Sequence, residues 1–298
     1  MIRSMLLALL LVLTSGPALA QNASQPFRSD RIVIETRGPA RPSGGDVILI
    51  PGIASTGEVW RRTADRLDDR HRVHIVTVRG FGSVPAGANA TGPVVRPVAR
   101  EIARYIASAR LDHPALIGHS MGGLIALEVA ADRGAGISRL MVVDGAPFFP
   151  SLVSAQARAA DVEPIARIAY QALLVLGDQA LRDGGNALGL DLGGAGDAVF
   201  DGVGWQGGNR ATLAQSLYEV MTLDLRPRLP AITAPVTVVY GWSTDDASPR
   251  AHVDGLFRQS FAALPRPARF DRIEGAEHMV MVDRPIQFMA VVERFLGG

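Results

Sequence analysis

The sequence contains no cysteine. Disulfide bridges, thiolate nucleophiles, cysteine-ligated zinc sites and attachment of a lipid to an N-terminal cysteine are therefore excluded. It also lacks a strong charge of either sign, because 30 lysine plus arginine residues and 29 acidic residues leave a formal net charge of +1. The basic residues are scattered, so we expect no nucleic acid or other large polyanion as a partner. With 48% hydrophobic and 20% charged residues, the composition is that of a globular chain.

No stretch after the N-terminal region reaches the roughly 20 apolar residues needed to cross a bilayer. The first twenty residues combine Arg3, an apolar stretch from Met5 to Leu13 and the small-residue ending Ala18-Leu19-Ala20. This order is typical of a secretory signal peptide. We therefore expect cleavage after Ala20 and a mature protein that is secreted or periplasmic, with no stable membrane anchor.

Short runs, most of them continuously apolar and β-branched, recur along the chain as candidate strands, at Arg31–Thr36, Asp46–Ile50, Arg72–Val78, Pro114–Gly118, Arg139–Asp144, Pro235–Gly241 and Ala268–Ile273. Such runs are typical of strands that are buried on both faces of a parallel sheet. Segments with helical periodicity lie between them, at Val94–Ser108, Met121–Asp132, Ala251–Leu264 and Pro285–Phe295. This alternation predicts an α/β fold with a doubly wound, mostly parallel sheet.

The alternation fails once, between Pro150 and Pro230. Two helical stretches, Val162–Gly177 and Arg210–Met221, flank a glycine-dense segment over residues 184–208. An insertion of this length between two strands predicts a helical cap or lid. The expected organisation is a signal peptide (residues 1–20), the first part of the core (21–149), the cap (150–230) and the second part of the core (231–298).

The pentapeptide Gly118-His119-Ser120-Met121-Gly122 has the pattern G-x-S-x-G, with a predicted strand before it and a predicted helix after it. In this context the chain turns so sharply that the serine takes a strained conformation, and glycines are needed beside it for steric reasons. The hydroxyl then stands clear of the backbone at the end of the sheet. Ser120 is therefore the candidate nucleophile.

A serine hydroxyl is a weak nucleophile at neutral pH and needs a base, an orienting acid and donors for an oxyanion. His278 is the candidate base, because it follows the last predicted strand and precedes the final helix. Asp245 is the preferred acid, since it lies in the loop after the penultimate strand, and Asp246 and Asp144 are alternatives. We expect His119 to point away from the Ser120 hydroxyl.

Two backbone amides are expected to bind the oxyanion. One is the amide of Met121, which follows the nucleophile. The other comes from the loop after Asp46–Ile50, where Ile53 is the first choice and Ala54 the second. No metal site is predicted, since the start of a calcium-binding repeat at Gly193–Asp197 is not repeated.

The stretches "LIPGIASTGEVW", "GHSMGG", "MVVDGAPFF" and "GAEHMVMVDRP", with the loop that holds Asp245, resemble the α/β-hydrolase superfamily, in the branch of esterases and lipases with a helical cap. The resemblance covers nearly all of the mature chain. It implies a Ser-His-acid triad, a covalent acyl-enzyme and no cofactor, and it places Trp60, Phe148 and Phe149 near the substrate pocket. The chain departs from its relatives at Pro51-Gly52, where many have His-Gly, and in the spacing between Gly241 and the acid.

The sequence thus predicts a serine hydrolase that cleaves small carboxylic esters. A lactonase or amidase with the same triad is the alternative among enzymes, because a lid rather than a triad selects the leaving group. Outside enzymes, the alternative is an inactive binding protein on the same fold.

Overall fold

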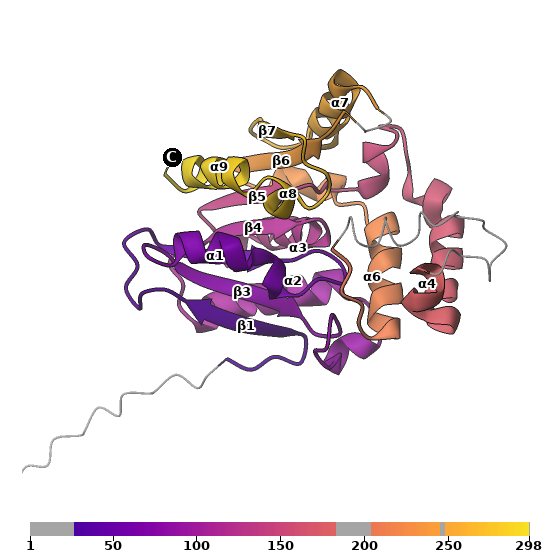
Figure 1. Ribbon diagram of the computed structural model, residues 1–298, viewed down its shortest axis with the longest axis horizontal. Coiled ribbons are helices and arrows are strands. Elements are labelled where there is room, and N and C mark those ends of the chain that lie inside the picture. The colour runs from indigo at the N-terminus through magenta and orange to yellow at the C-terminus, as the bar shows by residue number, and fades with distance from the viewer. Residues whose placement is uncertain (1–26, 183–203, 245–247, 298) are drawn as a thin grey trace, which may run out of the picture.

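The computed structural model describes residues 27–182, 204–244 and 248–297, and their core is one seven-stranded sheet (Figure 1). The strands follow the order β1-β3-β2-β4-β5-β6-β7. Only β1 runs antiparallel to its neighbour, so the predicted, mostly parallel sheet is confirmed. The strands are β1 (Ile32–Arg37), β2 (Asp46–Ile50), β3 (Arg72–Val78), β4 (Ala115–His119), β5 (Arg139–Val143), β6 (Val236–Trp242) and β7 (Arg269–Glu274).

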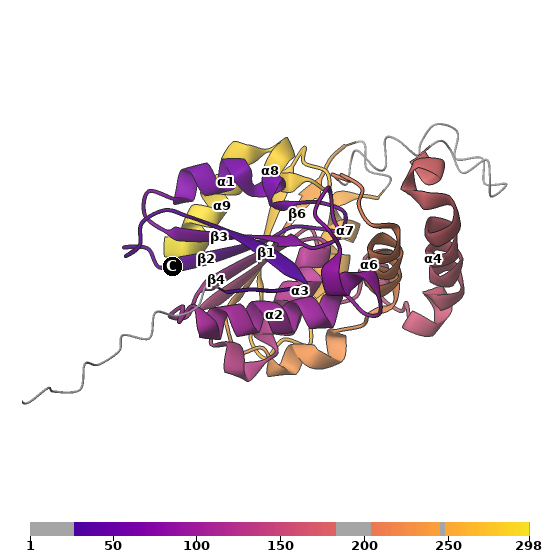
Figure 2. The same ribbon diagram turned by 90° about the horizontal axis from the view of Figure 1, so that it is seen from below.

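Helices cover both faces of the sheet (Figure 2). On one face lie α2 (Val95–Ser108) and α3 (Met121–Ala130), and on the other lie α1 (Arg61–Leu67), α8 (Val280–Asp283) and α9 (Pro285–Gly297). Successive residues of the central strands point into two separate apolar clusters, since Leu116 belongs to one cluster and Ile117 to the other. Burial on both faces explains why these strands are apolar throughout.

The predicted elements agree with the observed ones to within a few residues, and α7 (Arg250–Ser260) completes the predicted set of core helices. The short helices α1 and α8 were not predicted. Residues 1–20, with the proposed signal peptide, lie outside the described residues, as does the segment Gly193–Asp197. Within the described part of the chain, no helix is long and apolar enough to span a membrane.

Two helices, α4 (Ala159–Arg182) and α6 (Arg210–Thr222), lie between β5 and β6, where the sequence predicts an insertion. They lie beyond one end of the sheet (Figures 1 and 2). Hydrogen bonds join the chain around them to loops that follow strands, from Gln206 N to Ala54 O at 2.8 Å and from Leu225 N to Pro147 O at 2.8 Å. The insertion is therefore tied to the carboxyl end of the sheet, and its role as a cap stays a prediction.

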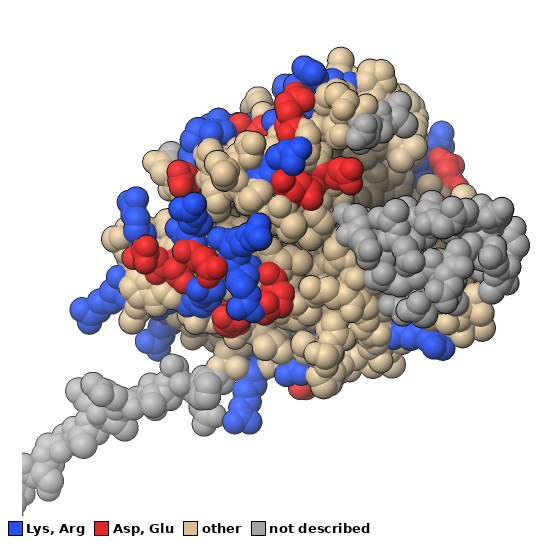
Figure 3. Space-filling model, viewed as in Figure 1, with Lys and Arg blue, Asp and Glu red and all other residues tan. Residues whose placement is uncertain are grey.

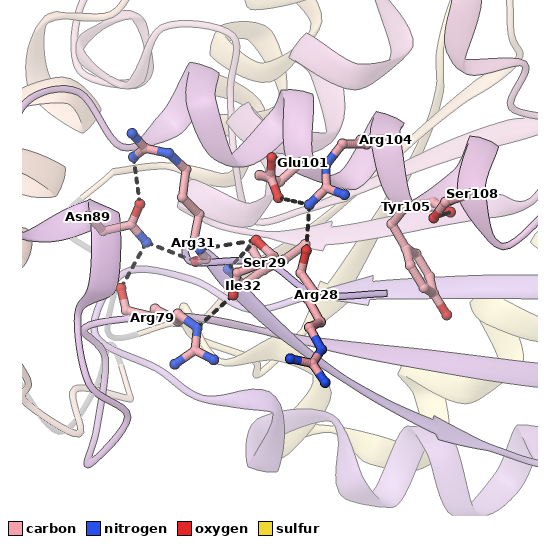
Figure 4. A network of polar contacts seen from close by, with 10 residues as sticks. All are labelled: Arg28, Ser29, Arg31, Ile32, Arg79, Asn89, Glu101, Arg104, Tyr105 and Ser108. Carbon is pink, nitrogen blue, oxygen red and sulfur yellow. Dashed lines mark hydrogen bonds and ion pairs between the residues drawn. The ribbon is translucent and has the colours of Figure 1, made fainter. Parts of the chain in front are cut away.

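The antiparallel edge strand is fixed by a polar network around Asn89 (Figure 4). The fully buried Asn89 amide donates to the carbonyl oxygens of Arg31, at 2.8 Å, and Arg79, at 2.9 Å, and it accepts from Arg31 Nη1. Arg104 of α2 donates to Arg28 O at 2.7 Å. The chain that enters β1 is thus held by both its neighbouring strand and a helix.

A second polar cluster is buried between β2, β3 and α2. Asp46 accepts from Arg72 at 2.6 Å and lies 2.9 Å from Nε2 of His74, and the Tyr105 hydroxyl lies 2.7 Å from Nδ1 of His74. Burial lowers the pKa of His74, so this ring is neutral and links two strands to a helix. Among the described residues, no group of three or more potential ligands could hold a metal ion.

Arginines and acidic residues are interleaved over the face that carries α1 (Figure 3). Arg37 pairs there with Asp65 and Asp68, each at 2.7 Å. Positive charge on this face is therefore matched locally by negative charge, which does not favour a polyanionic partner.

Candidate active site

The winding of the sheet places the candidate site at the carboxyl ends of its central strands. The chain passes from β2 to β3 on one side and then to β4 on the other side of β2. Ligands bind in open α/β sheets at such a reversal. Ser120 follows β4, Ile53 follows β2 and Asp144 follows β5, so the ends of three adjacent strands carry predicted site residues.

Ser120 occupies the sharp turn that the sequence predicts. Its φ of 52° and ψ of −122° lie outside the regions that residues with side chains usually adopt. A Cβ added to Gly118 would lie 2.2 Å from Gly122 O, and one added to Gly122 would lie 2.3 Å from Ile50 O. The turn therefore requires glycine at both positions. The Ser120 amide donates to Val143 O at 2.9 Å, which ties the turn to β5.

The amides expected to bind an oxyanion are free to do so. Neither the Met121 amide nor the Ile53 amide has an acceptor among the described residues. Met121 is the first residue of α3, whose N-terminus favours negative charge. The loop that holds Ile53 is tight, because Ala54 has a φ of 55° and Ser55 N donates to Gly52 O at 3.3 Å.

His278 and Asp144 form the central hydrogen bond of the site, with 2.6 Å between Nδ1 of the histidine and Oδ2 of the aspartate. Their side chains are 24% and 19% exposed. Asp144 Oδ1 accepts from Gly241 N at 3.2 Å, and its own amide donates to Val239 O at 2.7 Å. Asp144 has a φ of 43°, so its backbone conformation is strained and is held by these bonds.

The structure pairs His278 with Asp144, the third candidate for the triad acid. The physical reason is the order of the strands, since β5 lies between β4, which carries Ser120, and β6. A residue at the end of β5 stands between the serine and the chain returning from β7. Asp245 and Asp246 lie outside the described residues.

The segment that carries His278 packs directly on β6. A Cβ on Gly241 would lie 2.4 Å from Ala276 O, and Gly275 N donates to Trp242 O at 2.7 Å. Glu277 N donates to Asp283 Oδ2 at 2.9 Å. The backbone on the N-terminal side of His278 is thus fixed, and its ring is directed towards the end of β5.

His119 makes a contact that the sequence analysis missed. Its Nε2 lies 2.9 Å from the carbonyl oxygen of His278, and its predicted direction relative to the Ser120 hydroxyl stays a prediction. The His119 side chain is fully buried, and its burial lowers its pKa well below the ordinary value. The signal in the sequence is a histidine at the end of an apolar strand, where water cannot satisfy the ring.

Of the three aromatic residues expected near the pocket, Trp60 and Phe148 are fully buried. Trp60 belongs to the core, where its ring centroid lies 6.1 Å from that of Phe288, and its assignment to substrate binding stays a prediction. Phe148 has the Arg226 guanidinium 4.6 Å from its ring centroid. A contact between Phe148 and substrate stays a prediction, and Phe149, which is partly buried, begins a 3-10 helix.

The model of the alpha/beta hydrolase family matches residues 47–291, so the chain belongs to this family. It is 26% identical over 267 residues to a pimeloyl-[acyl-carrier protein] methyl ester esterase of Aeromonas hydrophila, which covers 85% of this chain and 96% of the relative. The solved structure of an esterase from Exiguobacterium antarcticum matches with a TM-score of 0.66 and 21% identity over 90% of this chain and 96% of its own. An enol-lactonase from Burkholderia xenovorans matches with a TM-score of 0.64 and 19% identity, over the same shares of the two chains. Both structures share the fold.

Gly122→Ala should destabilise the protein, because the added methyl group would meet the Ile50 and Pro51 carbonyl oxygens at 2.3 and 2.5 Å. We expect a loss of about 1–3 kcal/mol or more in the free energy of unfolding, measured by urea denaturation. Gly255→Ala is the matched control, since Gly255 lies within α7 with nothing near its added Cβ, and it should stabilise by about 0.5–1 kcal/mol. Equal effects of the two changes would contradict the steric argument.

Proposed function

We propose that this protein is a serine hydrolase that cleaves carboxylic esters, with Ser120, His278 and Asp144 as its triad. The observation that carries the proposal is the 2.6 Å hydrogen bond between His278 Nδ1 and Asp144 Oδ2. An ionised carboxylate only accepts hydrogen bonds, so Nδ1 of the imidazole holds the proton. The other ring nitrogen, Nε2, then has a free electron pair and can act as a base.

In the proposed reaction His278 Nε2 takes the hydroxyl proton as Ser120 Oγ attacks the ester carbonyl. The Met121 and Ile53 amides bind the oxygen that becomes negatively charged. The C–O bond to the alcohol breaks, the histidine returns its proton to the leaving oxygen, and an acyl-serine is left. Water activated by the same histidine then releases the acid and restores Ser120. These steps use the chain's own side chains and amides and need no cofactor.

Esters are favoured as the substrate class by a relative that is named a methyl ester esterase and matches this chain over 96% of its length. The Met121 and Ile53 amides, unpaired among the described residues, and the His278–Asp144 hydrogen bond favour a working enzyme over an inactive binding protein. The proposed substrate class is small carboxylic esters in general.

Ser120→Ala should abolish hydrolysis across a panel of chromogenic acyl esters, with a fall in kcat of at least about a thousandfold. The wild type should be labelled on Ser120 by a fluorophosphonate probe, as followed by mass spectrometry. A parallel panel of lactones and amides tests the alternatives. Faster turnover of a lactone or an amide than of any ester would make the protein a lactonase or an amidase. If wild type and Ser120→Ala are both inactive on every ester and no labelled adduct forms, the proposal is contradicted.

Asp144→Asn should lower kcat by about 10²–10⁴-fold, because an amide can donate to Nδ1 and then stabilises the wrong tautomer of His278. The matched controls are Asp245→Asn and Asp246→Asn, which should keep kcat within about threefold of wild type. Steady-state kinetics on one chromogenic ester measures all three. A large loss in Asp245→Asn with little loss in Asp144→Asn would return the acid role to Asp245.

We also propose that the protein is secreted or periplasmic, on the strength of its first twenty residues, which have the order of a cleavable signal peptide. Expression of the full chain in a bacterial host should export a protein that begins at Gln21. N-terminal sequencing and the intact mass of the exported protein measure this. Retention in the cytoplasm with Met1 still attached would contradict it.

A further inference from the structure

We propose that His119 is a positioning residue that holds the His278 backbone, and hence its imidazole, in register with Ser120. This inference rests on the proposed function of Ser120 and His278. His119 is the residue immediately before Ser120, and its side chain reaches the His278 carbonyl oxygen, 159 residues away in the chain. One side chain therefore joins the turn that carries the nucleophile to the segment that carries the base.

The direction of this hydrogen bond follows from the chemistry of its two ends. A carbonyl oxygen only accepts, so His119 Nε2 must carry a proton and donate it over 2.9 Å. The remaining nitrogen, Nδ1, is buried and has no hydrogen-bond partner among the described residues. A proton on Nδ1 would therefore be both buried and unsatisfied, which keeps the ring neutral and in one tautomer.

The packing around the ring leaves it little freedom. A Cβ added to Gly52 would lie 2.9 Å from His119 Nδ1 and 3.1 Å from Ser120 Cβ. The ring centroids of His119 and His278 are 4.7 Å apart, with 52° between their planes. The His119 ring is thus enclosed between the loop that supplies the Ile53 amide and the segment that carries His278. The absence of a side chain at Gly52 leaves room for this ring.

His278 is consequently held at two points. Its ring is held by Asp144, at 2.6 Å, and its main chain is held by His119, at 2.9 Å. Hydrogen bonds at Gly275 and Glu277 hold the chain before His278, whereas the bond from His119 holds the carbonyl group of His278 itself. A displacement of about 1 Å at a reacting group can cost on the order of a hundredfold in rate. We expect the bond from His119 to limit such a displacement of His278.

A role for His119 as a second proton carrier does not fit the same contacts. Its Nε2 faces a carbonyl oxygen, which does not take up a proton, and no described residue forms a hydrogen bond with its Nδ1. The titratable group that faces it is His278, which is itself paired with Asp144. His119 therefore acts through geometry and takes no part in proton transfer.

Two variants of similar length separate the hydrogen bond from the packing. His119→Gln keeps a side-chain N–H that can reach the carbonyl oxygen, whereas His119→Met has none. On the best ester of the panel, His119→Met should lower kcat about 10–100-fold with KM within about threefold, and His119→Gln should stay within about threefold of wild type. His252→Met, at an exposed position on α7, is the control and should match wild type.

The pH profile of kcat/KM should show the same single ionisation on its acidic side in all variants. His119 neither takes up nor releases a proton in the reaction, so its replacement removes no ionisation. Loss of an ionisation in His119→Met would mark His119 as a proton carrier and overturn the proposal. Equal kcat in His119→Met and wild type would overturn it, and so would equal losses in His119→Met and His119→Gln, because the hydrogen bond would then be irrelevant.

Nitrogen-15 NMR of the histidine rings tests the proposal without any turnover. Wild-type His119 should show the neutral Nε2–H tautomer from pH 5 to pH 8, and the Nδ1–H signal of His278 should shift in His119→Met but be retained in His119→Gln. A protonated His119 Nδ1, or a His278 signal unchanged in His119→Met, would overturn it. If wild type neither hydrolyses esters nor labels with the probe, the proposed function fails, whereas these ring signals still decide the positioning role.

Discussion

The site depends on the close approach of the Gly122 backbone to the main chain at the end of β2. With no side chain at Gly122, the first turn of α3 lies against the carbonyl oxygens of Ile50 and Pro51. This contact brings the N-terminus of the helix to the loop of Ile53, so that two unpaired amides come from adjacent strands. It also fixes Ser120 in a conformation with positive φ that a free peptide would seldom adopt. Strain at the serine is thus balanced by packing around it.

The remaining site residues extend this arrangement across the sheet. Ser120 is bonded to β5 through Val143, and Asp144 is bonded to β6 through Val239 and Gly241. The segment of His278 in turn lies on Gly241. Each member of the proposed triad is therefore positioned by the strand next to its own, and the geometry is set by main-chain hydrogen bonds of the sheet. The insertion contacts the same end through the bond from Gln206 to Ala54.

Local sterics made the turn around Ser120 predictable from the sequence. Glycine at positions 118 and 122 and the neighbouring apolar runs define the turn without knowledge of distant residues. The position of His278 was predictable too, because it lies between the last strand and the helices that end the chain. The carboxylate partner of His278 was not predictable, since the choice between Asp144 and Asp245 depends on which strand lies between β4 and β6.

Side-chain direction was the other limit. Trp60 was expected near the pocket, but it packs with Phe288 on the face of α1 and α9, and no local pattern distinguishes these two environments. The hydrogen bond from His119 to the His278 carbonyl joins two segments far apart in sequence, and it depends on the depth at which the His278 segment packs. The environment of Trp60 and the hydrogen bond of His119 both depend on contacts between segments far apart in sequence, which composition and periodicity do not reveal.

The position of Asp144 has a consequence for how this fold can diversify. Because the proposed acid, Asp144, follows β5, the connection from Trp242 to Arg250 carries no member of the proposed triad. Insertions or deletions in that connection would therefore leave the residues of the proposed triad in place. For a protein engineer, this connection is therefore a suitable place to introduce substitutions, insertions and deletions.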